Sequence, residues 1–228
     1  MEAKNFDIFN VISDIRKNGQ AVISVEGINI TLRKGVFIPD YKMFQLINTA
    51  IRFIEKNKTI LTIGDVGTGS GVIAVLIAKR FPNKKIFAYE TSAKAIKLAR
   101  YNTSKNNIKN VRFFNNKRGS WSNPPYKKID FIISNPPYLG NLEYASKNIF
   151  KKYPDLKYQP KMAIRSYDKY GILPFVKILN GAIRHQTKYI LFRSNADFVD
   201  KTVQTLQKIP HKIKIKKIRD GIIFAELK

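Results

Sequence analysis

From residue 60 to the end of the chain, apolar segments of strand length alternate with segments of helix length, and this pattern strongly constrains the fold. The predicted strands are Ile60–Val66, Lys85–Tyr89, Val111–Phe114, Ile129–Ser134, Tyr189–Arg193, His211–Ile218 and Ile222–Leu227. The predicted helices between them are Gly71–Arg80, Ser92–Asn106, Ile172–His185 and Ala196–Ile209. Such alternation predicts an α/β fold with a mostly parallel seven-stranded sheet and helices on both faces. The tight turn Arg219-Asp220-Gly221 makes the last two strands an antiparallel hairpin.

The residues ahead of this alternation predict three further elements. Phe6–Lys17 and Tyr41–Lys56 have apolar residues at helical spacing, and Asp40 is placed to cap the second helix. Between them, Ala21–Val25 and Ile28–Leu32 flank a Glu-Gly turn, as in a β-hairpin. We therefore expect an N-terminal appendage over residues 1–32 and one main domain over residues 33–228.

The charge of the chain is strongly unbalanced. It has 42 Lys and Arg against 16 Asp and Glu, a formal net charge of +26. Residues 1–40 carry five basic and five acidic residues, so the whole excess lies in residues 41–228. Codon bias explains abundant Lys and Asn, but it favours Asp and Glu about equally. The excess therefore favours a polyanionic partner, with RNA or ribosomal particles as the expected neighbours.

The composition also limits the location and the chemistry. The N-terminus lacks an apolar leader segment, and the longest apolar stretch, Val72–Ala78, is far shorter than the roughly 20 residues that span a bilayer. We expect a cytoplasmic protein that does not enter a membrane. The chain has no Cys, and His185 and His211 stand alone, so no metal site is expected.

A glycine-rich turn follows the first strand of the main domain, and a helix follows it directly. It reads Gly64-Asp65-Val66-Gly67-Thr68-Gly69-Ser70-Gly71. Glycines at this spacing let a ligand approach the backbone closely, although a purely structural turn is the simpler alternative. Glu90 ends the next strand, 19 residues beyond Gly71, where a carboxylate can accept hydrogen bonds from ribose hydroxyls. The two features together predict a nucleoside-binding site.

The tetrapeptide Asn135-Pro136-Pro137-Tyr138 comes directly after the strand Ile129–Ser134. The prolines stiffen the backbone, so the side chain of Asn135 and the carbonyl of Pro136 can both accept from one –NH2 group. Tyr138 offers a flat surface for a planar substrate. A second copy, Asn123–Tyr126, precedes the strand. Because ligands bind at the carboxyl ends of parallel strands, we assign the site to the later copy.

From about residue 33 onward the chain resembles the HemK/PrmC-type glutamine methyltransferases, class I enzymes that modify the Gly-Gly-Gln motif of release factors. Five segments carry the resemblance: Asp65–Gly71, Glu90, Asn135–Tyr138, Gly35–Pro39 and Tyr158–Ala163. It implies S-adenosylmethionine as cofactor, bound by Asp65, Gly67, Thr68, Gly69, Gly71, Glu90, Asn116 and Asn135. It also implies that Asn135, Pro136 and Tyr138 hold the acceptor. Asn116 stands where the family has an acid beside the adenine, and only residues 1–32 occupy the place of its helical substrate-binding domain.

Three functions remain open at this point. The first is transfer of a methyl group to a glutamine amide of a release factor. The second is methylation of an exocyclic amine in nucleic acid, with adenine N6 in RNA as the leading case, because a glutamine amide and this amine both present a conjugated –NH2 group. The third is binding of RNA without catalysis. In the first two cases we expect basic residues around Tyr138 and along residues 141–170.

Overall fold

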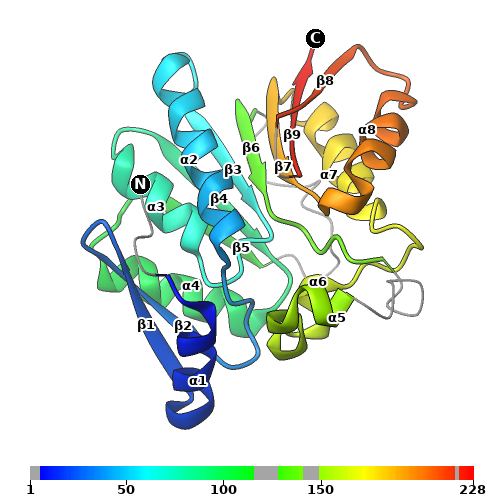
Figure 1. The fold of residues 1–228 in the computed structure, drawn as a ribbon. Helices are drawn as coiled ribbons and strands as arrows, with labels where there is room; N and C mark the ends of the chain where they lie inside the picture. Colours follow the sequence, from blue (N-terminus) through cyan, green and yellow to red (C-terminus); the bar gives the residue numbers. More distant parts are fainter. Residues whose placement is uncertain (1–5, 116–127, 141–148, 219–220) are drawn as a thin grey trace.

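The computed structural model describes residues 6–115, 128–140, 149–218 and 221–228 (Figure 1). Its main sheet contains β3 (Thr62–Val66), β4 (Lys85–Glu90), β5 (Val111–Asn115), β6 (Phe131–Ser134), β7 (Tyr189–Arg193), β8 (Ile213–Lys217) and β9 (Ile222–Leu227). The strand order is β5-β4-β3-β6-β7-β9-β8, in which the first five pair in parallel and β9 pairs antiparallel with both neighbours. The predicted parallel sheet with a C-terminal antiparallel hairpin is confirmed.

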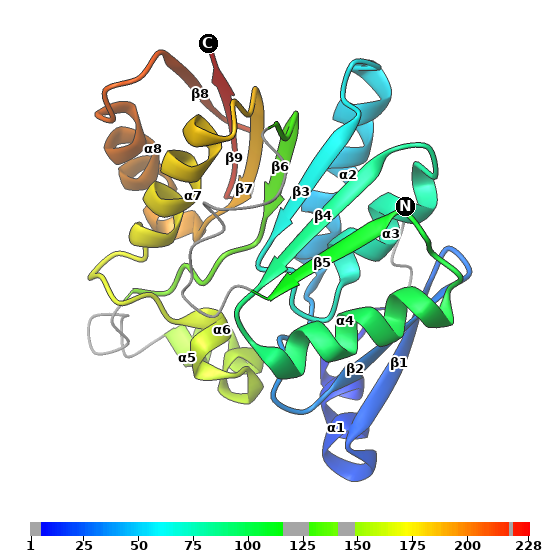
Figure 2. The ribbon, with the colours of Figure 1, turned by 180° about the vertical axis from the view of Figure 1, so that it is seen from behind.

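Helices cover both faces of this sheet (Figures 1 and 2). They are α2 (Tyr41–Lys56), α3 (Val72–Arg80), α4 (Ala93–Lys105), α7 (Leu173–Arg184) and α8 (Val199–Gln207). Successive strand residues point to opposite faces, so Ile133 packs with the α2 and α3 side whereas Ile132 packs with α7 and α8. Both faces of β6 are covered, and all four of its residues are buried. This explains its uninterrupted apolar sequence.

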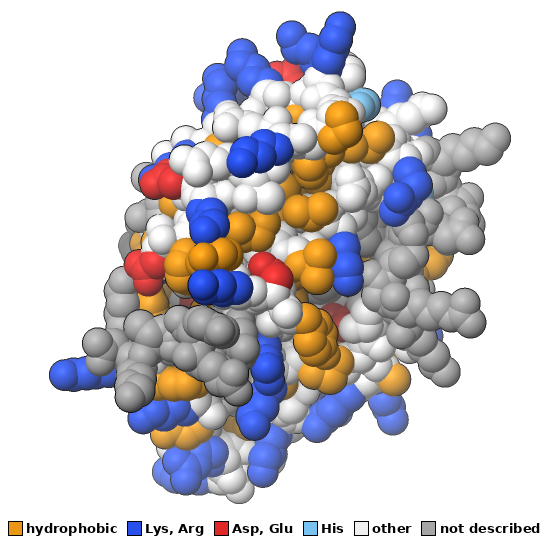
Figure 3. All heavy atoms as spheres, turned by 90° about the vertical axis from the view of Figure 1, so that its right-hand side faces the viewer, with side chains coloured by type: hydrophobic (Ala, Val, Ile, Leu, Met, Phe, Trp, Pro, Cys, Tyr) orange, Lys and Arg blue, Asp and Glu red, His pale blue; other side chains and the backbone are white. Residues whose placement is uncertain are grey.

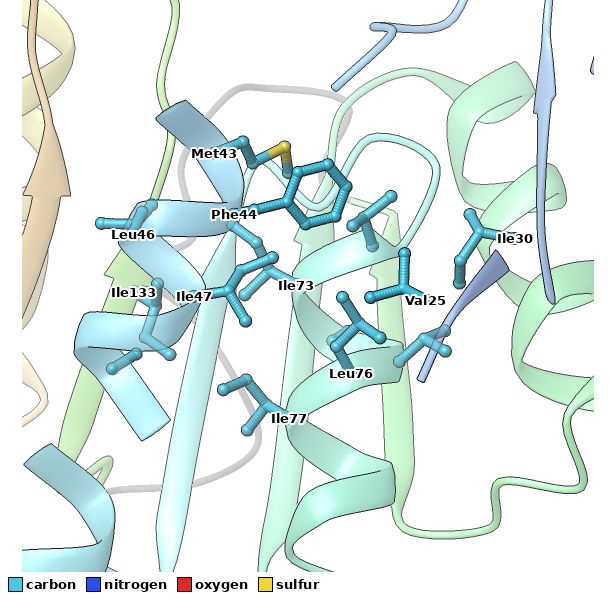
Figure 4. Close-up of a cluster of buried hydrophobic side chains, with 14 of the residues drawn as sticks. Val25, Ile30, Met43, Phe44, Leu46, Ile47, Ile73, Leu76, Ile77 and Ile133 are labelled. Atoms are coloured by element: carbon cyan, nitrogen blue, oxygen red, sulfur yellow. The ribbon is translucent and has the colours of Figure 1, made fainter. Parts of the chain in front are cut away.

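The larger of the two cores lies between α2, α3 and the sheet. Figure 4 shows Phe44 and Ile47 of α2 facing Ile73 and Ile77 of α3 in this core. Helix α2 begins where predicted, because the side chain of Asp40 accepts a hydrogen bond from the backbone N–H of Met43 at 2.9 Å. The cap sets where α2 begins, and the buried face holds it on the sheet.

The N-terminal elements share this core. They are α1 (Ile8–Asn18), β1 (Gln20–Val25) and β2 (Ile28–Arg33). β1 and β2 form the predicted hairpin, and its turn residues Glu26 and Gly27 both have positive φ angles. The amide of Asn102 in α4 accepts from the N–H of Thr31 and donates to the carbonyls of Thr31 and Ser70. The hairpin is therefore tied to α4 and to the glycine turn, while the domain division at residue 32 stays a prediction.

The structure differs from the sequence predictions mainly at element ends. β3 begins at Thr62 rather than at the predicted Ile60, because its pairing register with β4 starts at Thr62; the N–H groups of Leu61 and Thr62 both donate to the side chain of Asp130. Within residues 141–170, where no helix or strand was predicted, the described part contains α5 (Ile149–Lys152), the 3-10 helix η1 (Pro154–Tyr158) and α6 (Lys161–Ile164). The predicted helix from Ala196 begins with the 3-10 turn η2 (Ala196–Phe198). No helix among the described residues is long and apolar enough to cross a membrane.

Candidate active site

The glycine turn between β3 and α3 leaves its backbone open on one side. Gly67, Gly69 and Gly71 have φ angles of 79°, 59° and 85°, which residues with a Cβ rarely adopt. The N–H of Gly67 donates to the carbonyl of Tyr89 in β4 at 2.9 Å, which fixes the turn beside that strand. A Cβ on Gly67 or Gly69 would meet no described atom within 4 Å, whereas one on Gly71 would lie 3.0 Å from the Cβ of Ala99. The first two glycines therefore border open space, and the third lets α4 approach.

The buried carboxylate of Asp65 is hydrogen-bonded within this turn and to the helix that follows it. Its Oδ2 accepts from the hydroxyl of Thr68 at 2.6 Å and from the backbone N–H of Ala74 at 3.1 Å. Its Oδ1 has no hydrogen-bond partner among the described residues. Burial raises the pKa of the Asp65 carboxyl to about 7, against the opposing effect of its hydrogen bonds. Asp65 and Thr68 thus shape the turn from below.

Glu90 lies at the carboxyl end of β4, next to the turn. Its Oε2 accepts from the N–H of Gly69 at 2.9 Å, and its Oε1 accepts from the N–H groups of Thr91 and Ser92 at 2.8 and 2.9 Å. A carboxylate oxygen can accept two hydrogen bonds. Oε1 is therefore filled by the backbone, whereas Oε2 has room for one further donor beside Gly69.

The Asn-Pro-Pro-Tyr segment leaves β6 directly beside the glycine turn. Ser134 pairs with Val66 in the parallel register, and its hydroxyl donates to the carbonyl of Val66 at 2.6 Å. Asn135 follows, and its Oδ1 is buried with no hydrogen-bond partner in the described part of the chain. Burial raises the pKa of the Tyr138 phenol to about 12, so it stays protonated at neutral pH. An unused buried acceptor therefore lies beside the open turn.

A buried ion pair lies against Tyr138. The guanidinium of Arg193, at the end of β7, makes two bonds of 2.5 Å to the carboxylate of Asp40. The Arg193 side chain is 5% exposed and that of Asp40 is 26% exposed. The guanidinium carbon lies 5.3 Å from the ring centroid of Tyr138. The pair thus connects the start of α2 to β7 and supports one face of the tyrosine ring.

Two adjoining pockets flank Tyr138 and form what we call the Tyr138 groove. Their shared lining residues are Asp40, Tyr138, Leu139, Asp155 and Leu156. One pocket extends to Arg193 and the other to Asn135. Burial, with the charge of Asp40 nearby, raises the pKa of Asp155 above its ordinary value. The groove therefore places two carboxylates, Asp40 and Asp155, and two cations, Arg193 and Lys42, around the ring.

The Gly35–Pro39 and Tyr158–Ala163 segments meet at one wall of the groove, to which they contribute Phe37 and Ala163. The side-chain amide of Gln159 accepts from the N–H of Ile38 and donates to its carbonyl, both at 2.9 Å. Gln159 and Ile38 are both buried. The Gly35–Pro39 and Tyr158–Ala163 segments therefore meet in space, beside the Asn-Pro-Pro-Tyr segment.

The sequence located part of this site. The described residues among the predicted set lie together at the carboxyl edge of β3, β4 and β6. Asn116 and the Asn123–Tyr126 copy lie outside the described residues. Arg193 and Asp155 were not predicted from the sequence as site residues. Arg193 ends a predicted parallel strand, so the rule that ligands bind at carboxyl ends was the signal that could have found it.

Comparison with known proteins agrees with this geometry. Residues 47–155 match the methyltransferase small domain family. Release factor glutamine methyltransferases of Flavobacterium psychrophilum and Thermodesulfovibrio yellowstonii are 32% and 36% identical to the chain, over 80% and 72% of its length. The chain spans 63% and 55% of these two curated relatives.

Solved structures show the same fold. A methyltransferase from Pyrococcus furiosus has a TM-score of 0.60 at 20% identity and covers 97% of this chain and 95% of its own. The catalytic domain of hMettl16, solved in complex with the MAT2A 3'UTR hairpin 1, has a TM-score of 0.61 at 14% identity. The match covers 96% of this chain and 77% of the hMettl16 chain. The family model and the relatives support the HemK/PrmC-type family for this chain, and the solved structures show its class I methyltransferase fold.

Proposed function

We propose that this chain binds S-adenosylmethionine at the glycine turn and transfers its methyl group to a planar –NH2 nitrogen. One observation carries the proposal: the buried, unpartnered Oδ1 of Asn135 lies next to an open glycine turn. A buried acceptor without a donor is costly unless a ligand supplies one.

The residues present fit the cofactor. The backbone at Gly67 and Gly69 borders open space, so a nucleoside and its methionine part can approach closely. Glu90 Oε2 can accept a bond from a ribose hydroxyl while it keeps its bond to the N–H of Gly69. Asn116 remains our proposed contact to the adenine. When bound, the cofactor supplies a methyl group on a sulfonium sulfur.

The protein residues orient the acceptor nitrogen. Asn135 Oδ1 and the carbonyl of Pro136 would each accept one hydrogen of the –NH2 group, which directs the nitrogen lone pair toward the cofactor. Tyr138, supported by Arg193, would hold the acceptor plane from one side. The nitrogen loses its proton after it has gained the methyl group, so the step needs positioning rather than a basic side chain.

The acceptor that we favour is the side-chain amide of a glutamine in a release factor. The relatives named for that reaction match over most of this chain, and the groove beside Asn135 offers acceptors for peptide and amide N–H groups. Such a substrate would place the reaction in the cytoplasm.

An exocyclic amine of RNA is the alternative acceptor. The net charge of +26 and the fold shared with hMettl16, which was solved with an RNA hairpin, support this alternative. Adenine N6 is a conjugated –NH2 group, so Asn135 and Pro136 would hold it in the same way.

Labelled cofactor separates the two acceptors. The chain is incubated with methyl-labelled S-adenosylmethionine and either a purified release factor or total RNA, and the product is treated with protease or nuclease. We expect label that protease releases from the release factor, and little label in RNA. Asn83→Ala, an exposed change at the opposite edge of the sheet, should label normally, whereas Asn135→Ala should not. Label in RNA alone would favour the alternative, and label in neither substrate nor in a total cell extract would refute the proposal.

A further inference from the structure

A cluster of aromatic and basic side chains lies on the surface beside the Tyr138 groove. We call it the Tyr170 surface and define it as Tyr170, Lys169, Lys201 and Phe198. The ammonium nitrogen of Lys201 in α8 lies 3.4 Å from the ring centroid of Tyr170, and that of Lys169 lies 5.3 Å from it. The ring of Phe198 meets the same ring edge-on, with centroids 5.9 Å apart. Two segments of the chain therefore bring two cations to one partly exposed tyrosine.

Close backbone contacts fix this surface beside the proposed acceptor site. A Cβ on Gly171 would overlap the carbonyl oxygen of Tyr138, and one on Gly140 would overlap the carbonyl oxygen of Lys169. The side chain of Asp168 accepts from the N–H of Ile172 at 2.7 Å, which holds the segment at the start of α7. The Tyr170 surface is thus attached to the Asn-Pro-Pro-Tyr segment through the backbone.

Two acids near this surface have other partners among the described residues. Asp168 accepts hydrogen bonds from the backbone of α7, and Asp200 pairs with Lys217 at 2.9 Å. Hydrogen bonding to Lys201 and Lys169 lowers the pKa of the Tyr170 phenol, as expected where two cations converge. Figure 3 shows Lys and Arg spread over one face of the molecule, with apolar patches between them and few acids. The local chemistry is therefore cationic and aromatic.

We infer that the Tyr170 surface binds a single-stranded segment of RNA. The two lysines would contact successive phosphates, and the ring of Tyr170 would stack with a base once Lys201 turns to a phosphate. Tyr167, on the same segment, is 85% exposed and offers a second ring. An acidic peptide would satisfy the lysines, but it would leave the rings of Tyr167 and Tyr170 without a stacking partner. The inference holds for either acceptor, because the RNA would lie beside the groove and not in it.

Binding of labelled RNA tests the inference directly. The anisotropy of a fluorescent single strand of about a dozen nucleotides, a usual site size, is measured with the full chain at several salt concentrations. Lys169→Gln with Lys201→Gln should weaken binding at low salt by about tenfold or more, and should reduce the salt slope by about 1.4 for two lost contacts. Tyr170→Leu should weaken binding about fivefold or more.

The matched control removes the same charge at the opposite edge of the sheet. Lys58→Gln with Lys85→Gln changes two exposed lysines near the starts of β3 and β4, and should weaken binding only slightly. Circular dichroism checks that each variant is folded. Equal losses in both double variants, no effect of Tyr170→Leu, no RNA binding at low salt, or tighter binding of a polyglutamate peptide at the same lysines would each overturn the inference.

Discussion

Removal of one partner of the ion pair between Asp40 and Arg193 should destabilise the fold strongly. Arg193 is 5% exposed and makes two bonds of 2.5 Å to Asp40, which is 26% exposed. Removal of one partner of a buried pair costs about 3–5 kcal/mol, because the other charge stays buried without compensation. Asp40→Asn leaves the buried guanidinium of Arg193 without its counter-charge, so we expect the free energy of unfolding to fall by about 3 kcal/mol. Arg193→Met leaves the carboxylate of Asp40 unpaired, but water reaches that carboxylate, so the free energy of unfolding should fall by less.

Urea unfolding followed by circular dichroism measures these losses as shifts in the midpoint at constant slope. The matched control is Glu55→Gln, which breaks a surface pair to Arg80 whose side chains are 37% and 57% exposed. Exposed pairs contribute about 0–1 kcal/mol. The reasoning fails if Asp40→Asn costs no more than this control, or if Arg193→Met is the more damaging change.

Three further predictions concern the proposed cofactor and acceptor sites. Glu90→Ala should weaken S-adenosylmethionine binding by about 1.5–3 kcal/mol in titration calorimetry, because ribose hydroxyls lose a charged acceptor; an unchanged affinity would contradict the role of Glu90. Asn135→Ala should lower kcat by orders of magnitude with nearly unchanged cofactor affinity, while Asn123→Ala should leave kcat nearly unchanged. If the two variants showed the opposite effects, the site would have to be reassigned to the Asn123–Tyr126 copy. Burial raises the pKa of Asp65 to about 7, so between about pH 4 and 7 the folded state holds a proton that the unfolded state has released. The stability that Asp65 contributes should therefore fall as the pH rises through that window, so in urea titrations the difference between the unaltered chain and Asp65→Asn should change with pH; a parallel pH profile in the variant would contradict it.

The sequence predicted those parts of the fold that depend on local pattern. β6 is buried on both faces and reads as an apolar run, whereas the edge strand β8 (Ile213–Lys217) alternates and was predicted too long at both ends. The glycine turn was found because its positive φ angles require that residue type. Local signals therefore located both the central strand and the turn.

The remaining features depend on contacts between distant segments. The Arg193–Asp40 pair joins residues 153 positions apart, and the Gln159–Ile38 pair joins residues 121 positions apart. No local periodicity records either contact. The short helices near Gln159 were missed for the same reason, because segments of this length are not stable without tertiary support.

The charged groups inside the Tyr138 groove differ from those on the surface beside it, and this difference suggests which acceptor the site selects. Inside the groove, Arg193 is neutralised by Asp40, and Asp155 adds a half-buried carboxyl whose pKa is raised. Lys42 also lines the groove, and its charge counteracts the rise in the pKa of Asp155, so the described acids and cations there offset one another. Such a groove favours a neutral group that donates hydrogen bonds, such as an amide. Outside the groove, Lys169 and Lys201 present positive charge beside the same segment. A neutral –NH2 group that lies next to a polyanion satisfies both regions, as a glutamine of a release factor would beside RNA.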